Sequence, residues 1–290
     1  MIVAAVQARM GSTRLPNKVL AEIAGRPMLW HIVQRLRFAK RVDHVVIATA
    51  EGDANQPIRA FAEENGIPYF VGSELDLIDR LHTLACLFEA DALVRVTGDC
   101  PLVDPVVVDS LVETYSSNRG RVDYVSNVLP QSYPHGMDAE VYGASTLERL
   151  WHEITHPFWR EWFPAYLGEH KDSFRIINVA HPVNLTHHRW TVDYEEDLLF
   201  VREVFRQLYR EGRIFSMDEV LQLTEENPCL TFMNARHAQH TREQGIRAAL
   251  ESYLDSNLGR RPDEAALSDR ESHLPARRGS CRPCVDGRMD

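Results

Sequence analysis

Residues 2–18 of the chain read IVAAVQARMGSTRLPNK. The first part, residues 2–8, is a nearly continuous apolar run with the length of a buried strand, and it leads directly into a glycine-containing loop. Strands that are apolar on both faces are typical of parallel sheets covered by helices on two sides. This stretch therefore indicates the first strand of an α/β protein.

Strand and helix patterns alternate along the chain up to about residue 126. We predict further strands at 44–49, 69–71, 92–97 and 123–126. We predict helices at 27–39, 57–65 and 75–89, and another from Asp104, which caps the helix ahead of Pro105. This order predicts a mostly parallel, Rossmann-like sheet with helices on both faces. Ligands bind such sheets at the carboxyl ends of the strands.

The pattern changes between residues 129 and 188. Short strands are expected at 139–142 and 174–179, together with one helix that carries the aromatic residues of 158–163. We interpret 129–188 as an excursion from the main sheet that serves dimerisation or sugar binding, since aromatic residues are enriched at subunit interfaces. Core packing is the plainer reading of the same aromatics. Helices return at 195–209 and at 216–226, where Ser216 and Glu219 form a capping box.

The composition changes again after about residue 250. Arginine, proline, serine and aspartate are frequent there, and apolar residues are nearly absent. Such a segment cannot bury enough apolar surface to become ordered. We expect one folded domain over 1–250 and a disordered basic tail over 251–290, which is either a plain solvated tail or a contact for RNA or an acidic partner.

Charge and hydropathy exclude several classes of protein. The formal net charge is −10, which argues against a broad nucleic-acid surface. No apolar run approaches the roughly 20 residues that span a membrane, and the first residues lack the basic region of a signal peptide. The five cysteines show no disulfide pattern, which fits a cytoplasmic protein. Cys281 and Cys284 have the spacing of half a zinc site, and the alternative is that they belong to the tail.

The loop at 8–18 concentrates positive charge next to small residues. Its cations are Arg9, Arg14 and Lys18, and its small residues are Gly11, Ser12 and Thr13. Exposed backbone N–H groups combined with arginine and lysine are the groups that bind a triphosphate. The loop is not a Walker A sequence. The alternative is a solvated basic loop.

Two aspartates follow predicted strands at the same edge. Asp99 lies in Thr97-Gly98-Asp99-Cys100-Pro101, and Asp193 ends a short strand expected at 188–193. Carboxylates at this edge are placed to hold Mg²⁺, which in turn holds phosphate. Without a cation between them the two would repel each other. The alternative is that both lie in turns, and the acidic residues at 195–197 are explained by the helix dipole.

Five motifs in order resemble one family. Residues 8–18, 72–80, 98–101, 135–141 and 189–193 look like those of the SpsF-type branch (spore coat polysaccharide biosynthesis) of the cytidylyltransferases, over about residues 1–245. That superfamily also contains the enzymes that activate acylneuraminate and 3-deoxy-manno-octulosonate with CTP. The resemblance implies a nucleotide-diphospho-sugar transferase fold over 1–250. The chain departs from the pattern at Gln131-Ser132, where an arginine often precedes the Tyr-Pro pair.

The resemblance also implies roles for particular residues. Catalytic roles fall to Arg9, Arg14, Lys18 and Asp99. The nucleotide is expected at Ala8, Arg9, Gly11, Ser12, Arg14, Lys18, Thr49, Arg80, Thr97 and Gly98, with Arg80 near the base. The sugar is expected at Asn127, Gly136, Asp138 and Glu140. Mg²⁺, the implied cofactor, is expected on Asp99 and Asp193.

The implied reaction is the in-line attack of a sugar or sugar-acid hydroxyl on the α-phosphorus of CTP, with release of pyrophosphate. A homodimer is expected. Candidate general bases are His135, His181, His187 and His188, each of which is as readily explained as a solvated histidine. Two alternatives stay open: the same fold acting on GTP or UTP, and a catalytically silent scaffold that binds sugar nucleotides.

Overall fold

The computed structural model describes residues 1–237, 244, 247, 248 and 250–253. The chain divides into a compact unit, Met1–Ile246, and a second unit, Arg247–Asp290. Residues 250–253 are helical. The rest of the predicted basic tail, with Cys281 and Cys284, lies outside the described residues.

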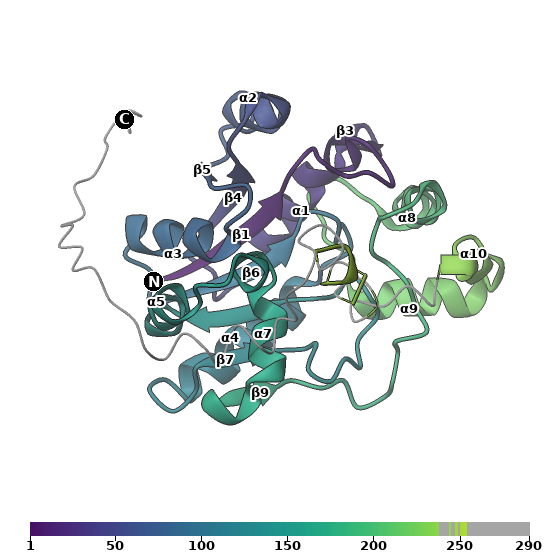
Figure 1. Cartoon of the computed structure of the whole chain (residues 1–290). Coiled ribbons are helices and arrows are strands. Elements are labelled where there is room, and N and C mark those ends of the chain that lie inside the picture. Colours follow the sequence, from purple (N-terminus) through teal and green to yellow (C-terminus); the bar gives the residue numbers. More distant parts are fainter. Residues whose placement is uncertain (238–243, 245–246, 249, 254–290) are drawn as a thin grey trace. The chain divides into compact units, whose positions relative to one another are not determined.

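A seven-stranded sheet forms the centre of the first unit (Figure 1), in the order β5-β4-β1-β6-β8-β7-β9. Every strand of it runs in one direction except β8, which is antiparallel to both of its neighbours. The strands are β1 (Ile2–Ala8), β4 (His44–Ala50), β5 (Tyr69–Gly72), β6 (Ala92–Thr97), β7 (Tyr124–Ser126), β8 (Glu140–Gly143) and β9 (Ile176–Asn178). A small hairpin joins β2 (Glu22–Ile23) to β3 (Arg26–Pro27). The predicted mostly parallel sheet is confirmed.

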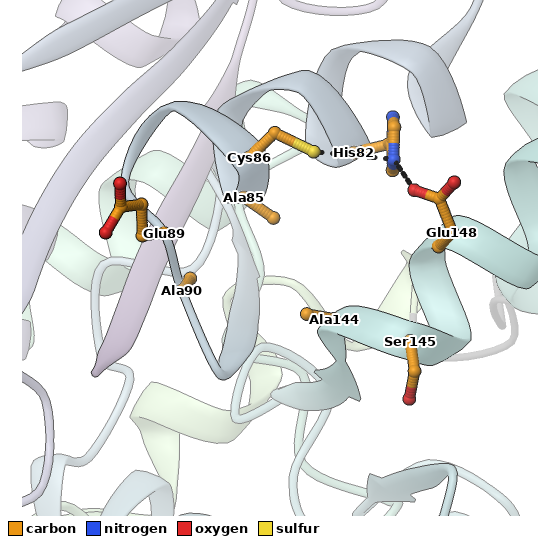
Figure 2. Close-up of a pocket in the computed structure, with 8 residues that line it drawn as sticks. All are labelled: His82, Ala85, Cys86, Glu89, Ala90, Ala144, Ser145 and Glu148. Atoms are coloured by element: carbon orange, nitrogen blue, oxygen red, sulfur yellow. Dashed lines mark hydrogen bonds and ion pairs between the residues drawn. The ribbon is translucent and has the colours of Figure 1, made fainter.

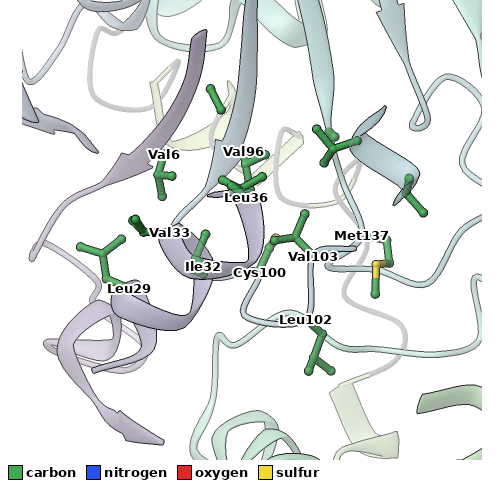
Figure 3. Close-up of a cluster of buried hydrophobic side chains, with 14 of the residues drawn as sticks. Val6, Leu29, Ile32, Val33, Leu36, Val96, Cys100, Leu102, Val103 and Met137 are labelled. Carbon is green, nitrogen blue, oxygen red and sulfur yellow. The ribbon is translucent and has the colours of Figure 1, made fainter. Parts of the chain in front are cut away.

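Helices cover both faces of the sheet, as the alternation of apolar runs predicts. One face packs on α1 (Met28–Arg37), α2 (Gln56–Glu64), α4 (Pro105–Ser117), α8 (Glu195–Leu208), α9 (Met217–Glu226) and α10 (Cys229–Phe232). The other face packs on α3 (Leu77–Leu87), α5 (Ala144–Glu153) and α7 (Phe163–Glu169). Figure 3 shows part of the first layer, where Ile32, Val33 and Leu36 of α1 lie beside Val6 of β1 and Val96 of β6.

Both predicted helix caps are present. The Asp104 carboxylate accepts a hydrogen bond from the Val106 N–H (2.7 Å), with Pro105 at the first helical position. Ser216 and Glu219 form the reciprocal pair of a capping box at the start of α9. Each cap satisfies N–H groups that have no partner inside the helix.

The sequence suggests that residues 129–188 form an excursion from the main sheet, but the two strands in this range are part of that sheet. Strand β8 lies between β6 and β7, and β9 pairs with β7. All four residues of β8 are buried, and buried backbone polar groups need hydrogen-bond partners on both sides. Strands this short obtain those partners by joining the existing sheet.

The prediction of a single aromatic helix around 158–163 is also wrong. Two short helices, α6 (Pro157–Glu161) and α7, meet at Trp162, whose backbone is not helical. Pro164 lacks an N–H group and clashes with the preceding turn of a continuous helix. The Phe158 and Phe163 side chains are buried within this chain, which agrees with the core-packing reading of these aromatics.

Strand β1 lies between β4 and β6, so the order of the parallel strands reverses there. The loop 9–18 follows β1, and residues 98–104 follow β6, so both leave the sheet at the same edge. Crevices at such a reversal are the usual ligand sites of open α/β sheets. Among the described residues, no helix has both the length and the apolar character to cross a membrane.

Candidate active site

The loop after β1 is anchored at its two ends and exposed between them. The buried Asn55 side chain accepts a hydrogen bond from the Met10 N–H (2.9 Å), and the Ser12 hydroxyl accepts one from the Leu15 N–H (3.4 Å). Arg9 and Arg14 are exposed, whereas Lys18, at the other end, is buried. The loop therefore presents its arginines to solvent while its lysine points into the protein.

The turn after β6 approaches the first loop closely. The Gly98 N–H donates to the Gln7 carbonyl (2.8 Å), and a Cβ at position 98 would lie 3.0 Å from that oxygen and 3.1 Å from the Ala8 Cβ. Glycine at 98 therefore lets the two loops pack together. The Thr97 hydroxyl donates to Asp99 Oδ1 (2.6 Å), which orients the carboxylate.

Lys18 joins the two predicted metal ligands. Its Nζ donates to Asp99 Oδ2 (2.8 Å), Asp193 Oδ1 (2.9 Å) and the Val192 carbonyl (2.8 Å). An ammonium group has three N–H donors, so all of them are used. The Lys18 ammonium is therefore a cation between the two carboxylates, and it offsets their mutual repulsion.

Asp193 receives two further cations. Arg14 Nη2 donates to its Oδ1 (2.7 Å), and Arg189 Nη2 donates to its Oδ2 (3.0 Å). Residues 188–193, predicted as a strand, form an extended segment with one bridge from Arg189 to His135. The backbone at Gly136, with φ +102°, lies against this segment. A Cβ at position 136 would lie 2.5 Å from the Thr191 nitrogen.

A second layer of contacts, which the sequence reading missed, fixes Arg189. Asp197 is fully buried, and its carboxylate accepts from Arg189 Nε (3.0 Å) and Nη2 (3.1 Å). The Asp197 carboxylate also accepts from the backbone N–H of Asp193 (3.0 Å) and from Asn234 Nδ2 (2.9 Å). The sequence pattern alone attributes Asp197 to the helix dipole. Its position three residues after the N-cap, Tyr194, was the available signal, since that position is the acceptor of a capping box.

Charge pairing sets the protonation of this centre. Burial by itself would raise the pKa of Asp99, but the Lys18 charge and hydrogen bond, with the Thr97 hydroxyl, lower it to about 2. Burial alone would lower the pKa of Lys18, yet Asp99 and Asp193 raise it. Asp99 and Lys18 are therefore both ionised at neutral pH.

The carboxylate pair fits a hard divalent cation. Asp99 Oδ2 and Asp193 Oδ1 share one nitrogen partner, so they lie within two hydrogen-bond lengths of each other. Mg²⁺ takes one or two carboxylates together with phosphate oxygens and water. The donor set and its position beside the arginine loop match that requirement.

The predicted nucleotide residue Arg80 has a different environment. It lies on α3, is 2% exposed, and its Nε and Nη1 have no hydrogen-bond partner among the described residues. Burial, then Arg9 and Arg95, lower its pKa to about 10. The hydroxyl of the buried Thr49, another predicted nucleotide residue, likewise lacks a partner in the described part of the chain.

The residues expected at the sugar divide into buried and accessible ones. Asn127 is buried. Its Nδ2 donates to the Met137 carbonyl (2.7 Å), and its Oδ1 accepts from the Ala139 N–H (3.0 Å). Glu140 is 1% exposed and is held by Arg95 and by the Tyr124 hydroxyl (2.5 Å). These two side chains are buried and bonded within the protein, so they support the wall of the site.

Asp138 is half-buried and accepts from Gln131 Nε2 (3.0 Å). It is the acidic member of the predicted sugar group that is within reach of solvent. The proposed histidine bases lie outside the Lys18 contacts. Burial, then His187, lowers the pKa of His188 to about 4, and burial, then Arg189, lowers that of His135.

Comparison with known proteins shows the family of this chain. The family model described as cytidylyltransferase matches residues 3–153, which is more than half of the chain. The chain belongs to the cytidylyltransferase family. The matched segment contains the arginine loop, Asp99 and residues 135–141, so the resemblance drawn from the motifs is confirmed.

Relatives of this cytidylyltransferase include SpsF, the spore coat polysaccharide biosynthesis protein of Bacillus subtilis. The two sequences are 28% identical over 232 residues, which cover 77% of this chain and 93% of that protein. The 3-deoxy-manno-octulosonate cytidylyltransferase of Geobacter sulfurreducens is 36% identical over 120 residues, 40% of this chain and 46% of that one. A solved cytidylyltransferase structure from Leptospira borgpetersenii serovar Hardjo-bovis is 30% identical with a TM-score of 0.76, covering 79% of this chain and 96% of that chain. The predicted fold class is thereby confirmed.

Proposed function

We propose that this cytidylyltransferase moves CMP from CTP to a hydroxyl of a sugar or sugar acid for a surface polysaccharide or glycan precursor, with Mg²⁺ as cofactor. The observation that carries the proposal is the Lys18 ammonium held between Asp99 and Asp193, with the exposed Arg14 paired to the same Asp193 carboxylate. The activities named for the relatives support this acceptor class.

The chain's own groups neutralise charge in the reaction. Arg9 and Arg14 lie where a triphosphate would approach the sheet edge, and arginine matches phosphate oxygens with paired N–H donors. Arg14 pairs with Asp193 in this structure, so it would exchange that carboxylate for a phosphate when CTP binds. The protein contributes position and preorganised charge to an in-line displacement, and no covalent intermediate is required.

Asp99 and Asp193 would hold the Mg²⁺. The ion would supply charge stabilisation at the α-phosphate and at the leaving pyrophosphate. Lys18 would then release one of its carboxylate bonds and remain as a neighbouring cation. Arg189 and Asp197 position Asp193 for this role through the contacts described above.

Arg80 is the proposed contact for the base. A buried guanidinium with two unpartnered nitrogens is costly unless a ligand accepts from them. Cytosine offers two adjacent acceptors, its carbonyl oxygen and its ring nitrogen. Uracil presents an N–H group in place of the second, so this contact favours CTP over UTP.

The acceptor is proposed to bind near Asp138, which is accessible, within a wall shaped by Asn127, Gly136 and Glu140. Asp138 can accept hydrogen bonds from sugar hydroxyls. The assay described below identifies which sugar is the acceptor.

A homodimer is also proposed. Trp159 and Trp162 remain half-buried on α6 and at its end, beside the buried Phe158. Tryptophan is enriched at protein–protein interfaces relative to the rest of the surface. Light scattering at micromolar concentration should give twice the chain mass, and a monomer would refute the proposal.

The test of function is an assay of pyrophosphate release with each of CTP, UTP, GTP and ATP, in the presence of Mg²⁺ and a panel of sugars and sugar acids. We expect release with CTP alone, and CTP should raise the melting temperature most, since a ligand that binds the native state stabilises it. Preference for GTP or UTP would establish the alternative nucleotide. Thermal protection by CTP without release for any acceptor would favour the silent scaffold.

A further inference from the structure

A second group of metal-binding side chains lies at the opposite edge of the sheet from Lys18. It joins the C-terminal half of α3 to the first turns of α5. Helix α5 follows β8, whose last residue, Gly143, pairs with Ala92 at the start of β6. The candidate active site follows the other end of β6, so the two groups are separated by the length of that strand.

The group consists of His82, Cys86 and Glu148 (Figure 2). His82 and Cys86 are four residues apart on α3, a spacing that puts both side chains on one face of a helix. Cys86 Sγ lies 3.5 Å from His82 Nε2, and Glu148 Oε2 contacts the same nitrogen. One ligand atom from each residue lies within 4.8 Å of the others.

We propose that these three residues bind a divalent cation of the zinc class. Zinc bonds sulfur at about 2.3 Å and imidazole nitrogen at about 2.0–2.1 Å, so tetrahedral geometry separates the two ligands by about 3.5 Å. The separation of Cys86 Sγ and His82 Nε2 matches that value. A thiolate, an imidazole and a carboxylate together favour Zn²⁺ over Mg²⁺ or Ca²⁺, which prefer oxygen ligands alone.

The imidazole is already oriented. The His82 ring stacks on the Trp151 indole, with ring centroids 4.9 Å apart and planes at 21°. Trp151 Nε1 donates to Asp79 Oδ1 (2.9 Å), which fixes the indole in turn. Contacts that fix the ring of a ligating histidine strengthen metal binding.

The carboxylate can adjust to an ion. The Glu148 side chain is 52% exposed, whereas that of His82 is 13% exposed. An ion entering between the two would replace their direct contact with two coordinate bonds after rotation of Glu148. His152 Nε2 lies 2.9 Å from Glu148 Oε1, so it is placed to hold the carboxylate.

An ion can reach the group from solvent. A hollow of about 320 Å³ opens beside it, lined by small side chains that include Ala85, Ala90 and Ala144 (Figure 2). A bound ion would link α3 to α5. It would thereby hold the helix that carries Arg80, two residues before His82.

The test is a titration of the metal-free full-length protein with Co²⁺ in excess Mg²⁺, followed by displacement with Zn²⁺. Mg²⁺ occupies the oxygen ligands of the Asp99–Asp193 pair, and a thiolate bound to Co²⁺ adds a charge-transfer band that oxygen ligands do not give. We expect one such Co²⁺ per chain and a rise in melting temperature with Zn²⁺.

Variants locate the ion. Cys86→Ser and His82→Gln should each weaken binding at least tenfold, and Cys86→Ser should lose the band. Cys86 is exposed, so serine should leave the metal-free melting temperature unchanged. The matched control is Cys229→Ser, at another exposed cysteine, which should bind as the parent does.

The tail supplies the decisive second control, because Cys281 and Cys284 also have metal-ligand spacing. The double variant Cys281→Ser/Cys284→Ser should retain the band. A band that survives Cys86→Ser but disappears in the tail variant would overturn the proposal, and so would the absence of any thiolate band in the parent protein.

Discussion

Lys18 and Arg80 are both buried cations, but their surroundings differ completely. Lys18 donates to two carboxylates and a carbonyl, and these contacts raise its pKa. Arg80 has two nitrogens without partners among the described residues, and burial lowers its pKa. The first cation is neutralised by the protein itself, and the second has donors to offer a ligand.

The difference indicates how each group meets a substrate. A metal ion must take carboxylates from Lys18, and a phosphate must take Lys18 from its carboxylates, so that region exchanges one set of charges for another. Arg80 needs no exchange, because a ligand that accepts hydrogen bonds removes the cost of unpaired donors. We infer that Lys18 tunes the reacting end of the site and that Arg80 contributes selectivity.

His31 shows a third outcome for a buried basic side chain. Its Nε2 lies 2.6 Å from the Ile23 carbonyl, and the ring is 2% exposed. Burial lowers its pKa to about 4, and Arg35 and Arg26 act in the same direction. His31 is therefore neutral at pH 7, whereas Lys18 and Arg80 are charged.

The largest expected effect comes from the carboxylates that pair with Lys18. Asp99→Asn keeps the shape and removes one charge, so turnover should fall about a hundredfold or more if Asp99 holds the catalytic ion. Asp193→Asn should behave alike, and the double variant should be little worse than either, because both serve one ion. Pyrophosphate release across a Mg²⁺ titration measures this.

Thermal melts of the same samples give the control for these variants, with Asp218→Asn on α9 as an exposed comparison. If both aspartates were only turn or capping residues, each change would cost about 1 kcal/mol of stability and turnover per folded molecule would be unchanged.

The next effect tests Lys18 as the internal counter-ion. Lys18→Met should lower the free energy of unfolding at pH 7 by about 2 kcal/mol, less than the loss for a fully buried pair because the carboxylates are partly exposed. In the parent protein, the pKa of Asp99 lies at about 2, below its ordinary 3.8, so its stabilising contribution is present above pH 3.8 and is lost as the pH falls toward 2.

The loss in free energy of unfolding caused by Lys18→Met should therefore become smaller below pH 4. Added Mg²⁺ should raise the melting temperature of the variant more than that of the parent, since the ion fills the place of the ammonium. An equal Mg²⁺ response in both proteins would contradict the shared site.

A smaller effect is expected for Arg80. Arg80→Met should raise the KM for CTP about tenfold, which corresponds to about 1.4 kcal/mol, and should leave folding stability unchanged or slightly higher. The matched control is Arg35→Met, because buried Arg35 donates to the Val103 (2.6 Å) and Phe215 (2.8 Å) carbonyls. That variant should lose stability without a specific change in KM. Loss of stability in Arg80→Met with normal KM would show that Arg80 is structural.

The smallest effect belongs to His31. Because its folded-state pKa is about 4 and its ordinary value is 6.5, the unfolded chain binds more protons between these limits. The contribution of neutral His31 to the free energy of unfolding is fully present above pH 6.5 and is lost as the pH falls toward 4. The loss between pH 7 and pH 5 is on the order of 1 kcal/mol. Denaturant unfolding at both values should show a shallower pH dependence for His31→Gln. Identical pH dependence would mean that another group titrates.

Much of the fold followed from local sequence patterns. The apolar run before the arginine loop, the caps at Asp104 and Ser216, and the alternation up to residue 126 each depend on residues close together in the chain. Such short-range signals act before any tertiary contact forms, so they can be read from a single sequence. The placement of β8 could not, because the partner of a short strand is chosen across the sheet.

The candidate site divides in the same way. The sequence by itself determined the chemistry: Arg9, Arg14 and Lys18 in one loop, with aspartates after later segments. Only the tertiary structure decided that Lys18 bridges Asp99 and Asp193, that buried Asp197 fixes Arg189, and that Arg80 lacks partners. Residue types are written in the chain, whereas a charge pair between residues 18, 99 and 193 depends on three segments that meet only when the sheet brings their ends to one edge.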